Sequence, residues 1–99
     1  MTILALDRPR PGATFEKYQP YMLNEVRHTW EAYKKGLIRD VYFRQDRPGV
    51  AIVMDCASLD EAQRLCADFP LAKAGLLDFE LIPLGPFTNW EVLFSQSGT

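Results

Sequence analysis

The stretch PLAKAGLLDFELIPLGPF, residues 70–87, decides the fold of this 99-residue chain. It predicts a turn and then a strand over Leu77–Leu84, with Pro83 close to the strand's end. Proline cannot donate a hydrogen bond to a neighbouring strand, so it suits a sheet edge or a strand terminus. Gly85 and Pro86 then stop the strand. A closing strand of this kind, after a strand and a helix, points to a small α+β fold.

The residues before this stretch supply the other elements. An apolar run at residues 2–6 predicts a first strand, closed by the prolines and glycine of residues 9–12. From there the apolar residues follow a helical period and share one helix face: Phe15, Met22, Val26, Trp30 and Tyr33. Pro20 predicts either the helix start or a kink, and Gly36 lies where a helix C-terminal cap is expected.

Two strands and a second helix follow. Residues 38–44 and 50–56 are rich in β-branched and aromatic side chains around a Pro-Gly turn, which predicts a hairpin. Ser58 and Glu61 form a capping box that opens a helix ending at Pro70. The order β-α-β-β-α-β predicts a ferredoxin-like α+β fold, with an antiparallel four-stranded sheet and both helices on one face. We expect one domain over residues 1–99, with an apolar C-terminal tail at residues 88–99.

Composition excludes several classes of partner. A formal charge of −2 supplies no basic field for phosphates, so nucleic acid is not an expected partner. No apolar run approaches the roughly 18 residues that a membrane span needs. The N-terminus lacks the basic segment of a signal peptide.

Cys56 and Cys66 fall on apolar strand and helix positions, which predicts buried, reduced thiols and a cytoplasmic protein, with a catalytic cysteine as the alternative.

Strand alternation predicts that the second face of the sheet also needs a cover. In residues 50–56, the side chains of Ile52 and Met54 share one face, while Ala51 and Val53 share the other, so both faces carry apolar groups. Exposed apolar patches usually mark interaction surfaces. We therefore expect a homodimer or higher homo-oligomer that packs sheet against sheet, with the apolar tail reaching across.

Three segments resemble the muconolactone isomerase-like family of the dimeric α+β barrel superfamily. They are GLIRDVYFRQDRPG (residues 36–49), SLDEA (58–62) and FPLAKAGLLDFELIPLGPF (69–87). The resemblance covers about the central two-thirds of the chain. It implies the dimeric barrel fold and a small-molecule ligand. The superfamily includes isomerases, cofactor-independent monooxygenases and members without catalytic activity, so the resemblance leaves the reaction open.

Isomerisation of a small lactone needs a base, a proton donor and a cation for a carboxylate. Tyr42 and Arg44 point the same way along one strand, and Glu80 lies on the closing strand. We expect Glu80 to act as the base, Tyr42 to take part in proton transfer and Arg44 to hold a substrate carboxylate. Alternatively, Arg44 pairs with a nearby carboxylate at a subunit interface.

His28 is the only histidine and the third catalytic candidate, although the helical wheel places it on the solvent side, away from the apolar stripe. An apolar ligand pocket between helices and sheet is expected to include four side chains: Trp30, Tyr33, Phe43 and Met54. The simpler account places the same four side chains in the hydrophobic core. One histidine with scattered carboxylates matches no metal-ligand spacing, and no cofactor motif is present, so we expect neither metal nor cofactor.

The sequence thus predicts a small-molecule-binding protein, and its leading interpretation is a cofactor-free isomerase that acts by proton transfer on a small organic acid or lactone. The alternatives are a non-catalytic dimeric binding or assembly module and a cofactor-independent monooxygenase.

Overall fold

The computed structural model describes residues 1–95, so residues 96–99 of the predicted tail lie outside the described part. Its elements are, in chain order, β1 (Thr2–Pro9), α1 (Phe15–Tyr18), the 3-10 turn η1 (Gln19–Tyr21), α2 (Met22–Lys34), β2 (Ile38–Phe43), β3 (Val50–Asp55), α3 (Leu59–Ala67), α4 (Pro70–Lys73), β4 (Leu77–Leu84), η2 (Thr88–Glu91) and α5 (Val92–Ser95).

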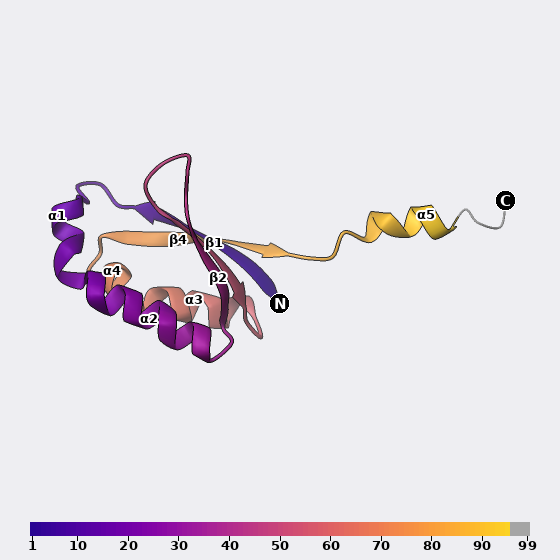
Figure 1. Cartoon of the computed structure of the whole chain (residues 1–99), viewed down its shortest axis with the longest axis horizontal. Coiled ribbons are helices and arrows are strands. Elements are labelled where there is room, and N and C mark those ends of the chain that lie inside the picture. Colours follow the sequence, from indigo (N-terminus) through magenta and orange to yellow (C-terminus); the bar gives the residue numbers. More distant parts are fainter. Residues whose placement is uncertain (96–99) are drawn as a thin grey trace.

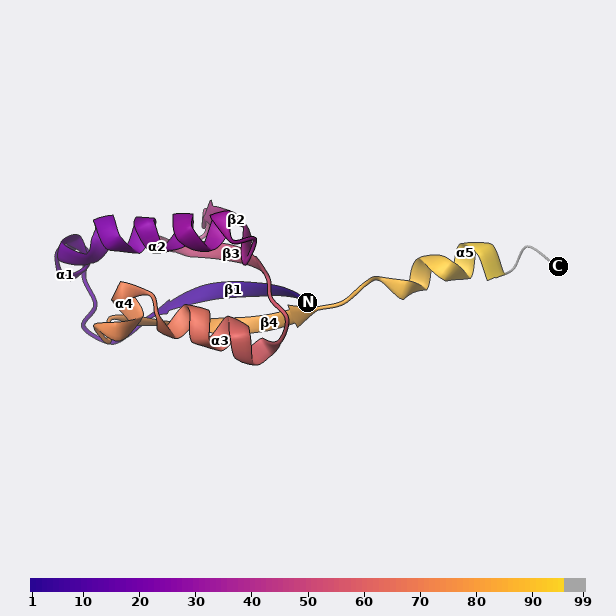
Figure 2. The ribbon, with the colours of Figure 1, turned by 90° about the horizontal axis from the view of Figure 1, so that it is seen from below.

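The four strands form one antiparallel sheet in the order β2-β3-β1-β4. Helices α2 and α3 lie side by side over one face of this sheet (Figures 1 and 2). This is the ferredoxin-like arrangement, so the predicted fold class is confirmed. We refer to the sheet face beneath α2 and α3 as the inner face and to the opposite one as the outer face.

Local signals explain where the elements begin and end. The Ser58 hydroxyl accepts a hydrogen bond from the Glu61 amide at 3.1 Å, and the Glu61 carboxylate accepts one from the Ala57 amide at 2.8 Å. This is the predicted capping box. Gly36 has a φ of +79° after α2, as expected of a helix C-terminal cap. Pro70 does more than end α3, because it also starts the single turn of α4.

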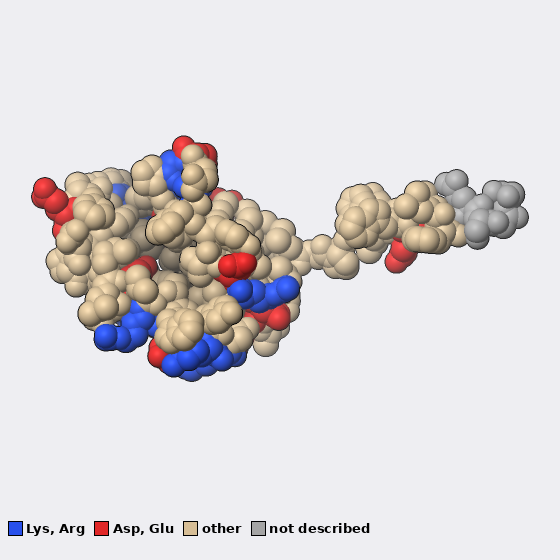
Figure 3. All heavy atoms as spheres, viewed as in Figure 1, with Lys and Arg blue, Asp and Glu red and all other residues tan. Residues whose placement is uncertain are grey.

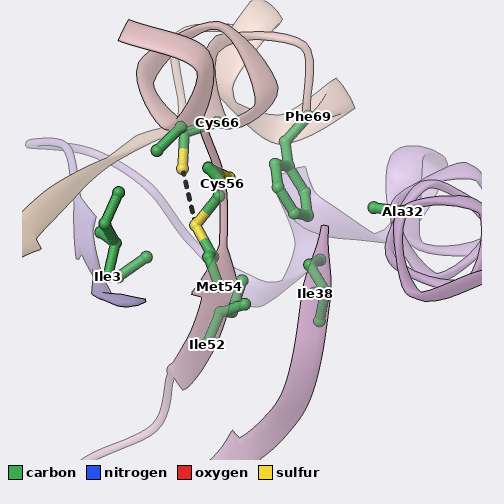
Figure 4. Packing of buried hydrophobic residues seen from close by; sticks show 10 residues of the cluster. Ile3, Ala32, Ile38, Ile52, Met54, Cys56, Cys66 and Phe69 are labelled. Atoms are coloured by element: carbon green, nitrogen blue, oxygen red, sulfur yellow. Dashed lines mark hydrogen bonds between the residues drawn. The ribbon is translucent and has the colours of Figure 1, made fainter. Parts of the chain in front are cut away.

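The core lies between the helices and the inner face. Ile52, Met54 and Cys56 of the β3 region and Ile3 of β1 are almost fully buried, as the alternation predicts, and Phe69 packs on them from the segment after α3 (Figure 4). Both cysteines are free and buried, and burial raises the pKa of the Cys66 thiol to about 12. A thiol held in its protonated form is a poor nucleophile, so the structure favours the predicted structural role over a catalytic one.

Strand β2 differs from the expected alternation. A simple period of two places Ile38 on the same face as Asp40 and Tyr42. A register shift between Ile38 and Asp40 instead turns Ile38 inward, where it is 1% exposed, while Val41 pairs with Ile52 of β3. An extra residue in a strand reverses the faces of all residues beyond it, which is why the simple period was wrong here.

Helix α2 packs on the core through an unexpected side. Its apolar stripe is largely in solvent: Val26 is 59%, Trp30 56% and Tyr33 52% exposed. The side that faces the core instead carries Ala32, which is buried, and His28, which is half-buried. The expectation that Trp30 and Tyr33 belong to the core is therefore wrong for the single chain.

The outer face and the C-terminus leave further apolar surface open. Four aliphatic side chains of the outer face are only half-buried: Leu4, Leu6, Val53 and Ile82. Beyond β4 the chain extends away from the body as an arm, which we define as residues 85–95 (Figures 1 and 2). The arm accounts for the elongated outline of 63 × 29 × 19 Å.

Candidate functional site

A cleft opens between α2 and the inner face of β2 and β3. Its volume is about 270 Å³, and Figure 3 shows a hollow on this side of the molecule. We call it the inner cleft. Most of its lining is apolar, and the residues concerned are Met22, Glu25, Val26, Thr29, Val41, Tyr42, Phe43, Val50, Ile52 and Phe69. An apolar concave site with few polar groups is typical of small-molecule binding, and this volume suits a ligand of about one substituted ring.

Glu25 is the one ionisable group of this lining whose carboxylate stands among apolar walls. Burial raises the pKa of the Glu25 carboxyl, and a hydrogen bond that it accepts from the Leu71 amide at 3.0 Å opposes part of the rise. The hydrogen bond from the Leu71 amide also fixes the carboxylate, because Leu71 is the buried residue of the single turn α4. A positioned carboxyl with a raised pKa is better matched to proton transfer near neutral pH than an exposed one.

A second carboxylate, that of Asp7, lies near the end of β1. Asp7 is only 4% exposed and points to the inner face, in alternation with Ile3 and Ala5. Among residues 1–95 its Oδ1 has no hydrogen-bond partner, although the Arg47 guanidinium stands 3.3 Å away and donates to the Asp7 backbone carbonyl. Gly49 makes this packing possible, since a Cβ there would stand 2.5 Å from Asp7 Oδ1.

Tyr18 connects the two carboxylates electrostatically. Burial raises the pKa of the Tyr18 hydroxyl, the charges of Asp7 and Glu25 raise it further, and the charge of Arg47 lowers it. Each of these groups is therefore near enough to influence Tyr18. The phenol stays protonated at neutral pH and can donate a hydrogen bond or a proton. A partly buried polar cluster thus stands at one end of the inner face.

Of the candidates Tyr42, Arg44 and Glu80, only Tyr42 belongs to the cleft lining, although its pairing with Ala51 turns its side chain toward the outer face. Tyr42 and Glu80 occupy the two ends of one cross-strand row that runs through Ala51 and Leu6. Three strand spacings separate them, which is about 14 Å. The structure therefore does not bring these two side chains into contact.

Tyr42 and Arg44 each have a local partner. The Tyr42 hydroxyl donates to Asp40, and this hydrogen bond raises the pKa of Tyr42. Arg44 makes a bidentate pair with Asp46, through bonds of 3.0 and 2.6 Å. That pair lowers the pKa of Asp46 to about 2. Arg44 thus follows the alternative of a local carboxylate partner.

His28 does not face solvent as the helical wheel suggested. Its Nε2 donates to the Leu65 carbonyl at 3.2 Å, and its ring meets Phe69 edge-on at 4.4 Å between centroids. These contacts place it between α2 and α3, outside the cleft lining. In this position the imidazole joins the two helices.

The four expected pocket residues separate into three environments. Phe43 lines the inner cleft, whereas Met54 is fully buried in the core. Trp30 and Tyr33 stack at 5.7 Å between centroids on the outside of α2. They belong to a neighbouring open depression of about 320 Å³, the α2–β2 groove, lined by Val26, Thr29, Trp30, Tyr33 and Val41.

Sequence reasoning missed Asp7, Tyr18, Glu25 and Arg47, although two of them carry a readable signal. Asp7 continues the inward alternation of Ile3 and Ala5, so a charge falls on a core-facing strand position. Glu25 stands three residues after Met22 and four before Thr29, on the stripe that lines the cleft. A charged residue at a position where the hydrophobic period of a strand or helix expects an apolar one is thus the sequence signal for such a buried carboxylate.

The described residues 1–95 carry neither a metal cluster nor a membrane-spanning helix. No group of three or more histidine, cysteine or acidic side chains there could hold a metal ion. No helix in that part of the chain is both long and apolar enough to cross a membrane.

Comparison with known proteins supports the fold. No protein-family model matches the chain, and no curated protein does. A solved structure that does match is 5-chloro-2-hydroxyhydroquinone dehydrochlorinase (TftG) from Burkholderia phenoliruptrix AC1100, in complex with 2,5-dihydroxybenzoquinone. The TM-score is 0.63 at 21% identity, over 90% of this chain and 98% of that chain. The chain therefore shares the ferredoxin-like α+β fold of that enzyme.

Proposed function

We propose that this protein binds a small oxygenated ring compound in the inner cleft and isomerises it by proton transfer without a cofactor, as a homodimer. The observation that carries the proposal is the Glu25 carboxylate, held by the Leu71 amide in an apolar cleft of single-ring size. The fold likeness adds support, because the dehydrochlorinase was solved with a dihydroxylated quinone bound. Isomerases are among the members of the superfamily that the chain resembles, which agrees with this reaction class.

The proposed reaction needs a base and a returning acid, and Glu25 serves as both. Its carboxylate removes a proton from a carbon beside a carbonyl, and the C–H electron pair moves into the conjugated system as an enolate. The protonated Glu25 then returns the proton to another carbon, so the product is an isomer and all atoms balance. Burial favours this role because it raises the pKa of the carboxyl.

The homodimer part of the proposal follows from the outer face. Its aliphatic row of Leu4, Leu6, Val53 and Ile82 meets water in a single chain. Packing two such faces together would remove that surface from water. Native mass spectrometry at micromolar concentration tests this: we expect a dimer or larger assembly, and a strictly monomeric mass would contradict it.

Ligand binding is tested with hydroquinone, a neutral ring that donates hydroxyl hydrogen bonds. We expect titration calorimetry at pH 7 to detect binding, and Glu25→Gln to weaken it by about tenfold or more, because a charge-assisted hydrogen bond is lost. Glu16→Gln on exposed α1 is the matched control and should bind like the wild type. Equal affinities for all three proteins would contradict the assignment of Glu25.

A non-catalytic assembly module is the second candidate, and the exposed apolar surfaces of the outer face and arm favour it. If the protein is such a module, Glu25→Gln leaves ligand binding and the dimer mass unchanged, and outer-face changes such as Leu6→Asp abolish the dimer. Under the leading proposal, Glu25→Gln alters ligand binding and leaves the dimer mass unchanged.

A further inference from the structure

The arm carries an apolar surface that no other segment of the described residues 1–95 buries. Trp90, Leu93 and Phe94 follow a spacing of i, i+3 and i+4 across η2 and α5, so they share one helical face. They are 67%, 73% and 74% exposed. Phe87 meets Trp90 edge-on at 5.6 Å, which adds to the same surface. Figure 3 shows the arm almost free of charged atoms in this view.

The α2–β2 groove is an open surface that is apolar like the arm. Val26, Trp30 and Tyr33 form one wall along α2, and Val41 of the edge strand β2 forms the other. The groove shares Val26, Thr29 and Val41 with the inner cleft, so the two depressions adjoin. Whatever fills the groove therefore also forms part of the wall around the ligand site.

The topology favours contact between the arm and the groove of another copy over contact with the groove of its own chain. The arm continues from β4, whereas the groove lies beside β2 at the opposite edge of the sheet. Figures 1 and 2 both show the arm pointing away from α2. In a twofold dimer each copy offers one arm and one groove, so both surfaces are covered by the same contact made twice.

We infer that the arm of one copy docks in the α2–β2 groove of a second copy and closes the inner cleft in trans. This inference rests on the proposed homodimer, and it makes the ligand site of each chain incomplete without its partner. It also accounts for the outward apolar stripe of α2, which is Val26, Trp30 and Tyr33.

Cross-linking between two differently tagged full-length chains tests the docking. One chain carries Tyr33→Cys and the other Leu93→Cys, and the mixture is treated with a short bismaleimide. Because each chain holds a single introduced thiol and Cys56 and Cys66 are buried, an arm-to-groove link can form only between copies. The matched control replaces Tyr33→Cys by Asp60→Cys, an exposed position on α3.

We expect a covalent heterodimer of both tags with Tyr33→Cys, in several-fold excess over the Asp60→Cys control. Equal yields from both pairs, or no heterodimer from either, would overturn the inference. Should Tyr33→Cys fail to fold, Trp30→Phe leaves Trp90 as the single tryptophan. Its emission should then move to shorter wavelength as the dimer forms, and an emission that stays that of an exposed indole at all concentrations would equally overturn the inference.

Closure of the cleft is tested by Trp90→Ala in the full chain. We expect hydroquinone binding to weaken by at least about fivefold, as for a central aromatic contact. Unchanged affinity would show that the arm does not close the site. Cross-linking and native mass need no ligand, so absence of hydroquinone binding by the wild type would remove the proposed function while leaving the arm contact standing.

Discussion

The two faces of the sheet carry similar residue types in different surroundings. On the inner side, Asp7 of β1 is buried, and Glu25 of α2 lines the apolar inner cleft. On the outer side, Tyr42 and Glu80 are exposed, and Tyr42 is already bonded to Asp40. Desolvation is what changes the chemistry of a carboxyl, so the inner face is where proton transfer is favoured. The same residue type in water is an ordinary surface group.

The largest effect should come from the core that holds the inner face. We expect Phe69→Ala to lower the free energy of unfolding by about 3–5 kcal/mol, because it leaves a cavity under His28 and Phe79. Urea denaturation measures the change. Phe43→Ala is the control, since that ring is 81% exposed and should cost far less. If both substitutions lowered the free energy of unfolding equally, the assignment of Phe69 to the packed core and of Phe43 to the surface would be wrong.

A smaller loss should follow from crowding the Asp7 cluster. We expect Gly49→Ala to cost about 1–3 kcal/mol, because its Cβ would press on the Asp7 and Arg47 side chains. Gly85→Ala is a matched substitution with no atom within 4 Å of the new Cβ, and thermal unfolding should hardly change. If Gly49→Ala left the free energy of unfolding unchanged, the Asp7 and Arg47 side chains would have moved aside at little cost, and Gly49 would not constrain Asp7.

The pH dependence of stability sharpens the comparison at Glu25. Its pKa is raised in the folded state, so the folded protein binds the proton more tightly than the unfolded chain does. Stability attributable to this group is then present at low pH and falls as pH rises above the ordinary value of about 4.5. We expect Glu25→Gln to remove this decline, measured as the difference in unfolding free energy from wild type between pH 4 and 7. A difference that does not vary with pH would contradict the burial of the carboxyl.

The smallest effect belongs to Asp46, whose pKa is lowered to about 2 by Arg44. A lowered carboxyl pKa contributes stability above the ordinary value of 3.8, and this contribution is lost as pH falls toward 2. Because the pair is open to solvent and salt, we expect Asp46→Asn to change the unfolding temperature only slightly at pH 7. The difference should vanish near pH 2. A large change at pH 7 would show that Arg44 and Asp46 hold the hairpin.

Much of the fold was predictable because its signals are local. The capping box at Ser58, the glycine cap at Gly36 and the alternation of β3 each depend on residues a few positions apart. The candidate site was not predictable in the same way. The helical period of Trp30 and Tyr33 predicts that they belong to the core, yet both side chains are exposed in the structure. The period shows which residues share a helix face, but it does not show whether that face packs against the protein or lies in solvent.

The sequence by itself determined the elements, their order and hence the ferredoxin-like fold, because caps, turns and hydrophobic periods act over short distances. Only the tertiary structure decided which side of α2 packs inward, where β2 shifts register, and that Asp7 and Glu25 both influence Tyr18. These outcomes depend on pairing of segments far apart in the chain, where the fit of side chains chooses among alternatives that the local pattern leaves equal.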